Sequence, residues 1–343
     1  MQQLTIPRPD DWHLHLRDGA TLRAVVAHSA QHFARAIVMP NLNPPVTTFE
    51  QASAYRDRIL AALPAGSRFE PLMTLYLTDQ TSAEQIEQAA ASGIITAVKL
   101  YPAGATTNSA AGVTDLRNCT GVLNTMSEIG LPLLIHGEQT SAAIDIFARE
   151  QAFIEQVFMP LRERHPDLKI VLEHVTSAAG AKLVCGSDTN LAATFTPQHL
   201  LYNRNDLLVG GLKPHFYCMP ILKREDDRQA LLEAATSGHP RLFLGTDSAP
   251  HPRSAKESAC GCAGCFSAPI ALGLYAEAFA QAGKLENLEA FASRNGPAFY
   301  GLPVNSETIT LQKCSSPVPE TYPGGDEQIV PLRAGESVAW SVA

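Results

Sequence analysis

The stretch DDWHLHLRDG, residues 10–19, stands near the start of the chain and places two histidines one residue apart. Successive side chains of an extended strand alternate between two faces, so His13 and His15 would point the same way. The opposite face would carry the three large apolar residues of the stretch: Trp12, Leu14 and Leu16. Two imidazoles on one face form half of a metal site, although such pairs also occur as merely hydrogen-bonded or solvated histidines. The rest of the chain therefore decides between these readings.

Short apolar runs rich in β-branched residues recur along the chain, separated by helix-like stretches. The predicted strands span residues 11–15, 36–40, 70–77, 96–101, 132–137, 169–174, 191–196 and 241–246. The predicted helices between them span residues 21–33, 49–62, 82–91, 116–129, 142–161, 177–185 and 224–236. Alternating units at this spacing predict an α/β fold with a parallel sheet, and eight of them match a (β/α)₈ TIM barrel. No Gly-x-Gly-x-x-Gly follows the first strand, which disfavours a dinucleotide-binding sheet.

The part of the chain after the eighth strand contains a long loop at 249–266 and two more predicted helices, at 268–281 and 288–301. The tail, 304–343, is polar and rich in proline and glycine, so we expect it to pack on the outside or bottom of the barrel as an extension. Because no convincing linker divides the chain, residues 1–343 are predicted to form a single domain that includes this tail.

Composition limits the kind of partner. The chain has 343 residues, of which 45% are hydrophobic and 17% charged, as in soluble globular proteins. A net charge of −8 argues against nucleic acid or an anionic membrane as the main partner, but leaves room for a small anionic substrate. We see no signal peptide and no run long enough to span a membrane. The seven scattered cysteines predict reduced thiols in a cytoplasmic protein.

The polar residues at the predicted strand ends point to the chemistry, because barrel enzymes carry their catalytic groups there. These residues are His13, His15, Asn41, Lys99, His136, His174 and Asp247. Any single one of them can be structural, but four histidines and an aspartate on one rim are hard to attribute to chance. Imidazole and carboxylate ligands without cysteine suit zinc-like divalent metals in an open, catalytic site.

Lys99 is the unexpected member of this set, since two dications would repel an ammonium strongly in a low-dielectric pocket. A neutral lysine amine can instead add carbon dioxide to give a carbamate, whose two oxygens can bridge two metals. Together with Asp247 and a bridging hydroxide, a carbamate leaves the site only slightly positive. We therefore hypothesise that Lys99 is carboxylated.

The motifs extend over most of the chain. They are His13-Leu-His15-Leu-Arg17-Asp-Gly, Met39-Pro-Asn41-Leu, Lys99-Leu-Tyr-Pro, Ala105-Thr106-Thr107-Asn108, His136-Gly-Glu, Glu173-His174, Lys213-Pro-His-Phe-Tyr-Cys-Met219-Pro, Gly245-Thr-Asp247-Ser-Ala-Pro-His251 and Lys256-Glu-Ser-Ala-Cys-Gly-Cys-Ala263-Gly-Cys-Phe. In these motifs the chain resembles the shorter, bacterial-type dihydroorotases of the amidohydrolase superfamily. It departs slightly at 252–254, which is less basic than expected, and at Met219, a volume-conserving replacement of leucine.

The resemblance implies a zinc-dependent enzyme with two Zn²⁺ ions per subunit, bridged by carboxylated Lys99 and a hydroxide. It makes His13, His15, Lys99 and Asp247 ligands of the more buried metal. It makes Lys99, His136 and His174 ligands of the other. The implied reaction is the reversible interconversion of L-dihydroorotate and N-carbamoyl-L-aspartate in pyrimidine biosynthesis, and the implied assembly is a homodimer.

In the implied mechanism the hydroxide attacks the amide carbonyl, which the metal near His136 and His174 polarises, while Asp247 serves as general acid and base. Arg17 is suited to bind the substrate carboxylate bidentately, with Asn41 and His251 completing that pocket. The resemblance adds four substrate-binding residues: Met219, Ala263 and, on a lid at 102–112, Thr106 and Thr107.

Three other functions remain open on the sequence alone. A hydantoinase or allantoinase would share the metal ligands, but the Arg17, Asn41 and His251 set demands an acidic substrate. A catalytically dead barrel acting as a scaffold would have lost ligands, and all six ligand positions are intact. A cysteine-based metal or redox protein rests only on the cluster at 260–265, where three thiols fall short of a structural zinc site and the glycines favour a tight turn.

Overall fold

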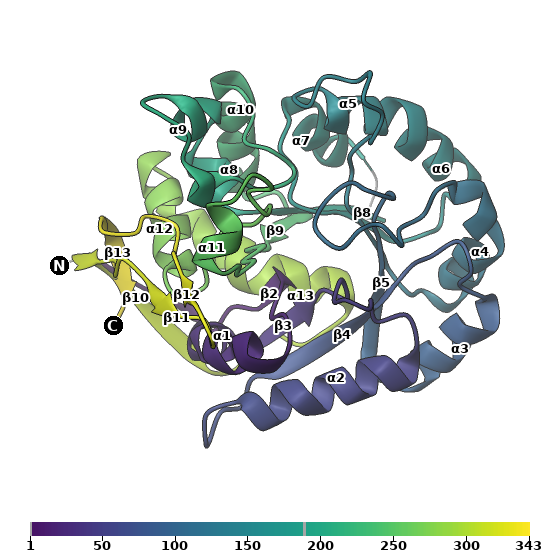
Figure 1. Ribbon diagram of the computed structural model, residues 1–343, viewed down its shortest axis with the longest axis horizontal. Helices are drawn as coiled ribbons and strands as arrows, with labels where there is room; N and C mark the ends of the chain where they lie inside the picture. The colour runs from purple at the N-terminus through teal and green to yellow at the C-terminus, as the bar shows by residue number, and fades with distance from the viewer. Residues whose placement is uncertain (1, 188–189) are drawn as a thin grey trace.

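The computed structural model describes residues 2–187 and 190–343, and its centre is a parallel eight-stranded barrel (Figure 1). Its strands follow chain order, from β2 to β9, and each overlaps a predicted strand. They are β2 (Asp11–Leu14), β3 (Arg35–Val38), β4 (Glu70–Tyr76), β5 (Ile95–Leu100), β6 (Leu133–Ile135), β7 (Ile170–Leu172), β8 (Leu191–Phe195) and β9 (Leu242–Leu244). The predicted (β/α)₈ barrel is confirmed.

The barrel closes where its first strand meets the end of its last. The backbone N–H of Asp247 donates to the His13 carbonyl at 2.8 Å, and that of His15 donates to the Ser248 carbonyl at 3.1 Å. Asp11, which is fully buried, accepts hydrogen bonds from the backbone and the hydroxyl of Thr246 at 2.8 and 2.6 Å. This seam brings the two ends of the strand series together at the carboxyl rim.

The barrel interior below the rim is filled by one apolar side chain from each strand, as small parallel barrels require. They are Trp12, Ile37, Leu72, Ala97, Leu134, Val171, Ala192 and Phe243. Trp12 was predicted to share a face with Leu14 and Leu16, and this is wrong, because those two leucines pack in the layer between sheet and helices. A register irregularity between Asp11 and Leu14 breaks the strict alternation of faces.

The helices surround the barrel (Figure 1). They are α1 (Gly19–His32), α2 (Phe49–Ala62), α3 (Ala83–Ala91), α4 (Thr120–Ile129), α5 (Arg149–Phe153), α6 (Met159–Arg164), α7 (Ala178–Cys185), α8 (Pro197–Leu201), α9 (Arg204–Leu208), α10 (Glu225–Thr236), α11 (Arg253–Lys256), α12 (Ala271–Gln281) and α13 (Asn295–Tyr300). Short 3₁₀ turns span Leu116–Cys119, Pro214–Phe216 and Leu285–Asn287, and π-helical turns span Ile154–Phe158 and Ala290–Arg294. In the described ranges, no helix combines the length and apolar character needed to cross a bilayer.

One predicted helix begins too early. Residues 142–148 form turns, and the helical backbone starts at Arg149 rather than at 142. Asp145 accounts for this, because its side chain accepts from the Phe147 backbone at 2.7 Å and its carbonyl accepts from Ala148 at 2.8 Å. Such local hydrogen bonds compete with those of a helix. The short helices α8 and α9 were not predicted.

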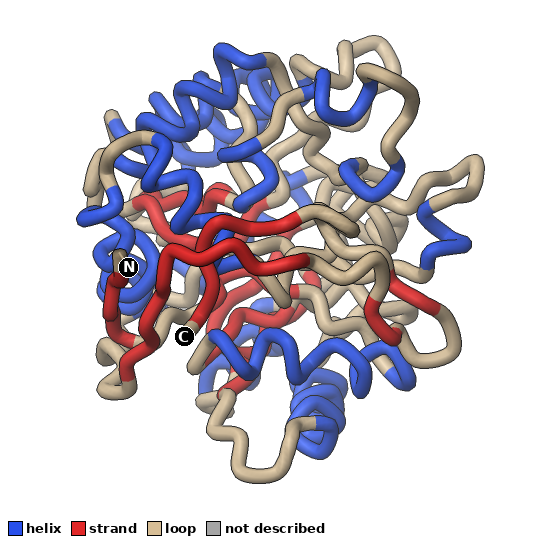
Figure 2. Tube along the Cα trace, turned by 90° about the vertical axis from the view of Figure 1, so that its left-hand side faces the viewer, coloured by secondary structure: helices blue, strands red, loops and turns tan. Residues whose placement is uncertain are grey.

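The tail adds strands that were also not predicted. β10 (Thr308–Pro317) pairs antiparallel with β1 (Gln3–Pro7) on one side and with β13 (Ser337–Val342) on the other. A further pair joins β11 (Tyr322–Pro323) to β12 (Gln328–Ile329). Figure 2 shows the three-stranded sheet crossing one side of the barrel, with both chain ends on it. The expectation that the tail packs on the barrel is confirmed.

Candidate active site

A small pocket opens at the carboxyl rim of the barrel, and nearly all of the predicted site residues line it. Its lining comprises His13, His15, Arg17, Asn41, Tyr101, Thr106, Thr107, His136, His174, Met219, Asp247, Ala249, Ala263 and Gly264. Two predicted residues stand just behind this lining. Lys99 lies below the ring of Tyr101, with Nζ 5.1 Å from the ring centre, and His251 contacts Arg17.

His13, His15 and Asp247 converge on one point. The Nε2 atoms of the two histidines are 3.3 Å apart, and they lie 3.4 and 3.0 Å from Oδ1 of Asp247. All three side chains are nearly excluded from solvent. Gly245 makes the approach possible, since a Cβ there would lie 3.1 Å from that of His13 and 2.7 Å from that of Thr194.

The other ring nitrogens of these two histidines are held by acceptors. Nδ1 of His13 lies 2.7 Å from a carboxylate oxygen of Glu173, and Nδ1 of His15 lies 2.8 Å from the amide oxygen of Asn41. Each Nδ1 must therefore carry the hydrogen, which leaves lone pairs on both Nε2 atoms. Two lone pairs and a carboxylate oxygen facing one point repel each other unless a cation lies between them. This donor set fits a divalent metal.

Burial keeps the imidazoles neutral, which metal binding requires. Because both rings are buried, the pKa of His13 falls well below its usual value and that of His15 is lowered too. Burial alone would raise the pKa of Asp247, but His13, His15 and Lys99 outweigh it and lower that pKa to about 2. The carboxylate is thus charged and the rings are uncharged at neutral pH.

A second set of donors lies beside the first. The rings of His136 and His174 are 4.7 Å apart between centres, and that of His174 is 5.0 Å from that of His13. Nε2 of His136 lies 2.9 Å from Glu138, so Nδ1 is the nitrogen left to face a ligand. Nδ1 of His174 is buried and has no hydrogen-bond partner among the described residues. Each ring therefore keeps a nitrogen that is not used in a hydrogen bond to the protein, as a ligand of a second ion requires.

Lys99 is wholly buried, yet its Nζ finds no hydrogen-bond partner in the described part of the chain. An unpartnered buried ammonium is costly. Burial accordingly lowers the pKa of Lys99 to about 8, which makes the neutral amine much easier to form than in a solvent-exposed lysine. A neutral amine is the form that adds carbon dioxide, so the environment fits the predicted carbamate.

Three pocket residues adopt the left-handed backbone region, which is uncommon outside glycine. They are Arg17, His174 and Asp247, with φ of 59°, 39° and 45°. Arg17 is fixed in this conformation by Tyr55, whose hydroxyl donates to its carbonyl at 2.6 Å. Such conformations cluster at functional sites because the surrounding structure must hold them in place.

Arg17, Asn41 and His251 form the predicted carboxylate-binding pocket, called here the anion clamp. It contains two competing hydrogen bonds. Nε2 of His251 lies 2.9 Å from Nη2 of Arg17 and 3.0 Å from the carbonyl of Ala263. Burial, followed by the charges of Arg17 and Lys256, lowers the pKa of His251 to about 2, so the ring is neutral. One nitrogen of a neutral ring cannot both accept from Arg17 and donate to Ala263. When His251 donates to Ala263, that edge of the guanidinium is free for a carboxylate.

The predicted lid lies over this pocket. The amide of Asn41 donates to the Thr107 carbonyl at 3.1 Å, and that of Asn108 donates back to the Asn41 carbonyl at 3.0 Å. The hydroxyl of Thr107 donates to the Ala263 carbonyl at 3.3 Å. Asn41 thus orients His15 and also holds the lid. These contacts are in addition to its predicted role in binding the substrate carboxylate.

The cysteine cluster at 260–265 is a turn. Gly261 and Gly264 have φ of 72° and 147°, and all seven cysteines are free thiols. Among the described residues, the only group of three or more converging metal-ligating side chains is that of His13, His15 and Asp247. A cysteine-based metal site is therefore not supported.

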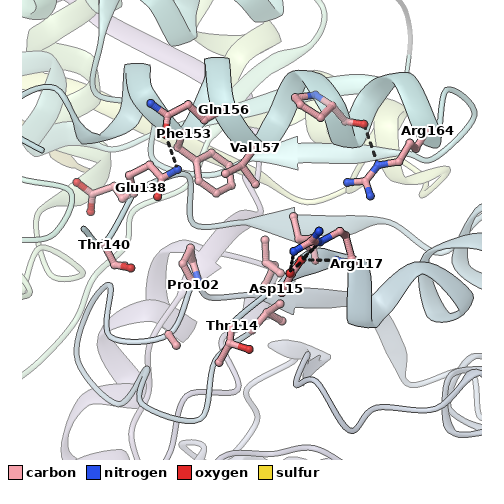
Figure 3. Close-up of a pocket in the computed structure, with 16 residues that line it drawn as sticks. Pro102, Thr114, Asp115, Arg117, Glu138, Thr140, Phe153, Gln156, Val157 and Arg164 are labelled. Carbon is pink, nitrogen blue, oxygen red and sulfur yellow. Dashed lines mark hydrogen bonds and ion pairs between the residues drawn. The ribbon is translucent and has the colours of Figure 1, made fainter. Parts of the chain in front are cut away.

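A larger pocket of about 680 Å³ lies beside the site, between the base of the lid and the helices of residues 149–164 (Figure 3). Glu138 belongs to both regions, because it lines this pocket and also contacts His136. Arg117 pairs with Asp115 there rather than facing an open site. The described lining contains no histidine or cysteine, so the metal-binding donors belong to the smaller pocket.

Several residues that position the site were not predicted. Glu173 orients His13, and Glu138 orients His136. Each glutamate lies within two residues of a strand-end histidine in the sequence, and this proximity could have indicated its role. Glu150 accepts four hydrogen bonds from the backbone and hydroxyl groups of Thr176 and Ser177, and so fixes the turn after His174. Nothing local in the sequence indicates the role of Glu150.

The comparisons with known proteins agree with this geometry. A model of the amidohydrolase family matches residues 10–313. A dihydroorotase of Halorhodospira halophila is 74% identical over 340 residues, which cover 99% of each chain. The crystal structure of dihydroorotase from Campylobacter jejuni has a TM-score of 0.91 at 38% identity, covering 99% of this chain and 97% of that one. That of dihydroorotase from Saccharomyces cerevisiae in complex with 5-fluoroorotic acid has a TM-score of 0.92 at 34% identity, covering 100% and 99%. The chain belongs to the amidohydrolase family, and within that family it belongs to the dihydroorotases.

Proposed function

We propose that the chain interconverts L-dihydroorotate and N-carbamoyl-L-aspartate at a pocket that holds two divalent metal ions. Its membership of the dihydroorotases supports this reaction, a step of pyrimidine biosynthesis. The observation that carries the site is the convergence of three acceptor atoms, from His13, His15 and Asp247, beside the Arg17–His251 pair. A metal-facing cluster next to a cationic clamp suits a cyclic amide that carries a carboxylate.

In this proposal His13, His15 and Asp247 would hold one ion and His136 and His174 would hold the other, with carboxylated Lys99 as a ligand to both. Bound divalent ions lower the pKa of a water molecule and polarise a carbonyl group. The buried, unpartnered Nζ of Lys99 supports this role, because a carbamate would bring the negative charge that two dications attract, whereas an ammonium would be repelled by them. Zinc is the metal we expect, since imidazole and carboxylate donors suit it.

Asp247 has the proton-transfer role. Its carboxylate is ionised at neutral pH, so it can accept a proton from the attacking water and deliver it to the nitrogen that leaves during ring opening. In ring closure the same carboxylate works in the opposite direction. The backbone of Asp247 is held by its N–H, which donates to the His13 carbonyl at 2.8 Å, and the side chain lines the pocket.

Arg17 binds the substrate carboxylate, with His251 and Asn41 completing the clamp. The left-handed backbone of Arg17 and its Nε contact to the Pro250 carbonyl, at 3.1 Å, fix the direction of the guanidinium. The yeast relative was solved with 5-fluoroorotic acid, a ligand that also carries a carboxylate, and this supports an acidic substrate here. Thr106 and Thr107 cover the substrate from the lid, while Met219 and Ala263 form part of the wall.

We also propose that the protein works as a cytoplasmic homodimer. Seven free thiols support a reducing compartment. The dimer rests on the resemblance alone, and sedimentation equilibrium of the purified protein tests it directly.

An assay of zinc-supplemented protein with L-dihydroorotate, beside a hydantoin control, tests the function. Turnover of dihydroorotate alone, abolished by Asp247→Asn, is the expected result. Turnover of the hydantoin alone would mean that the metal chemistry is right and the anion clamp is wrong. Intact mass measured under native, carbon-dioxide-replete conditions checks Lys99, and a bare ammonium in the metal-loaded protein would refute the carbamate.

A further inference from the structure

Lys256 is a buried lysine that the proposed reaction does not use, at the start of the cysteine-rich loop. Its Nζ lies 2.7 Å from the carbonyl of Tyr217, 2.7 Å from that of Cys262 and 2.8 Å from that of Gly264. Carbonyl oxygens only accept, so each contact needs its own N–H. A neutral amine offers two and an ammonium three, so these contacts require the charged form.

The loop backbone is arranged around this cation. The carbonyls of Cys262 and Gly264 face Lys256, whereas the carbonyl of Ala263 between them faces the pocket. There it meets the hydroxyl of Thr107 at 3.3 Å and Nε2 of His251 at 3.0 Å. The lid and the anion clamp therefore share one carbonyl acceptor.

This arrangement needs support, because it is strained. Cys262 has a φ of 26°, in the region that side chains rarely adopt. At Gly264 a Cβ would lie 2.7 Å from the Cβ of Ala249, so only glycine fits. The carbonyls gathered at Lys256 would present their negative ends to one another without the ammonium, and the loop would then relax.

We propose that Lys256 is a positioning residue for substrate binding, which holds the 262–264 backbone so that the Ala263 carbonyl joins Thr107 to His251. Lys256 acts in this way only if the proposed function holds, because the lid and clamp are assigned to substrate there. The cysteine-rich loop thus owes its shape to a buried cation and to its glycines rather than to a metal.

Lys256→Met removes the charge and nearly preserves the length of the side chain, so it is the first variant to make. Its KM for dihydroorotate should rise roughly tenfold or more, while kcat and metal content stay close to those of the wild type. Lys284→Met, at an exposed position, is the matched control and should leave KM unchanged. A variant with lower thermal stability but an unchanged KM would overturn the proposal.

A double-mutant cycle with Thr107→Val separates positioning from general damage. Removing the hydroxyl should raise KM in the wild-type background but have much less effect beside Lys256→Met, where Ala263 is no longer held. Additive effects would contradict the proposal. If Lys256→Met does not fold, Lys256→Arg replaces it in the double-mutant cycle with Thr107→Val. Arginine keeps the buried charge but cannot direct three N–H groups from one atom.

The two proposals fail in different ways. Wild-type protein with no activity on dihydroorotate would refute the proposed function before any variant is made. An active wild type with an unchanged KM in the Lys256 variants would refute the role of Lys256 alone.

Discussion

Nδ1 of His13 lies 2.7 Å from Oε2 of Glu173, the residue that immediately precedes His174. The same oxygen accepts from the hydroxyl of Thr194 at 2.6 Å, which fixes the carboxylate against β8. The peptide that carries His174 thus also orients a histidine from the other group of donors. The two groups of donors are mechanically linked through these adjacent residues.

Glu173→Gln should weaken metal retention by roughly 10- to 100-fold, because the amide no longer favours the His13 tautomer as a carboxylate does. The measurement is the metal content of the protein after dialysis against graded chelator. Glu87→Gln, on the exposed face of α3, is the matched control and should retain metal like the wild type. Equal retention in both variants would remove Glu173 from the site.

Arg17→Lys should lower kcat/KM by roughly 100-fold, since an ammonium cannot reproduce the two parallel N–H groups of a guanidinium. Steady-state kinetics with dihydroorotate measure this. Arg68→Lys is a suitable control, because Arg68 is 85% exposed. Near-normal turnover by Arg17→Lys would show that the substrate carboxylate binds elsewhere.

Replacing Thr106 and Thr107 together by alanine should raise KM about tenfold, because the lid loses its hydroxyl contacts while its backbone bonds to Asn41 remain. Kinetics of the double variant, beside the exposed control Thr140→Ala, provide the measurement. An unchanged KM and kcat would limit the loop to a passive cover.

His32 should make the protein less stable in mild acid. The ring ends α1 and is buried against the carbonyl of Ala268, and burial lowers its pKa from 6.5 to about 4. Between these values the unfolded chain binds a proton and the folded protein does not, so stability is full above pH 6.5 and falls as the pH drops toward 4. The loss from this residue is about 3 kcal/mol over the whole window.

Urea unfolding at several pH values measures this slope. His32→Gln should flatten the dependence between pH 6.5 and 4, because glutamine does not titrate there. Gln31→Ala, on the exposed face of the same helix, should keep the wild-type slope. A slope that is identical in all three proteins would exclude His32 as its source.

The barrel could be predicted because its signals are local. Strands buried on both faces appear as short apolar runs, and the position of catalytic groups at strand ends predicts that His136 and Asp247 share one rim. The strand β10 carries a local signal too, with Ile309 and Leu311 buried in alternation. It was missed because its partners, β1 and β13, lie at opposite ends of the chain, and a local pattern does not reveal such pairing.

The contacts that orient the site were harder to predict, for the same reason. Asp11 and Thr246 meet across the barrel seam, and Glu150 reaches the turn after His174 from a separate helix. Their sequence neighbours do not distinguish Asp11 and Glu150 from ordinary surface carboxylates. Lys256 likewise looks like one more charged residue in a polar loop until its three carbonyl partners are known.

The barrel seam has a consequence for how the protein is made. His13 and His15 emerge from the ribosome early, whereas Asp247 emerges only after seven further strands. A nascent chain therefore offers the ion a bare pair of imidazoles, and the carboxylate arrives only when β9 docks beside β2. Under the proposed function, tight retention of metal would report that the barrel has closed, because the ligands come from both ends of the strand series.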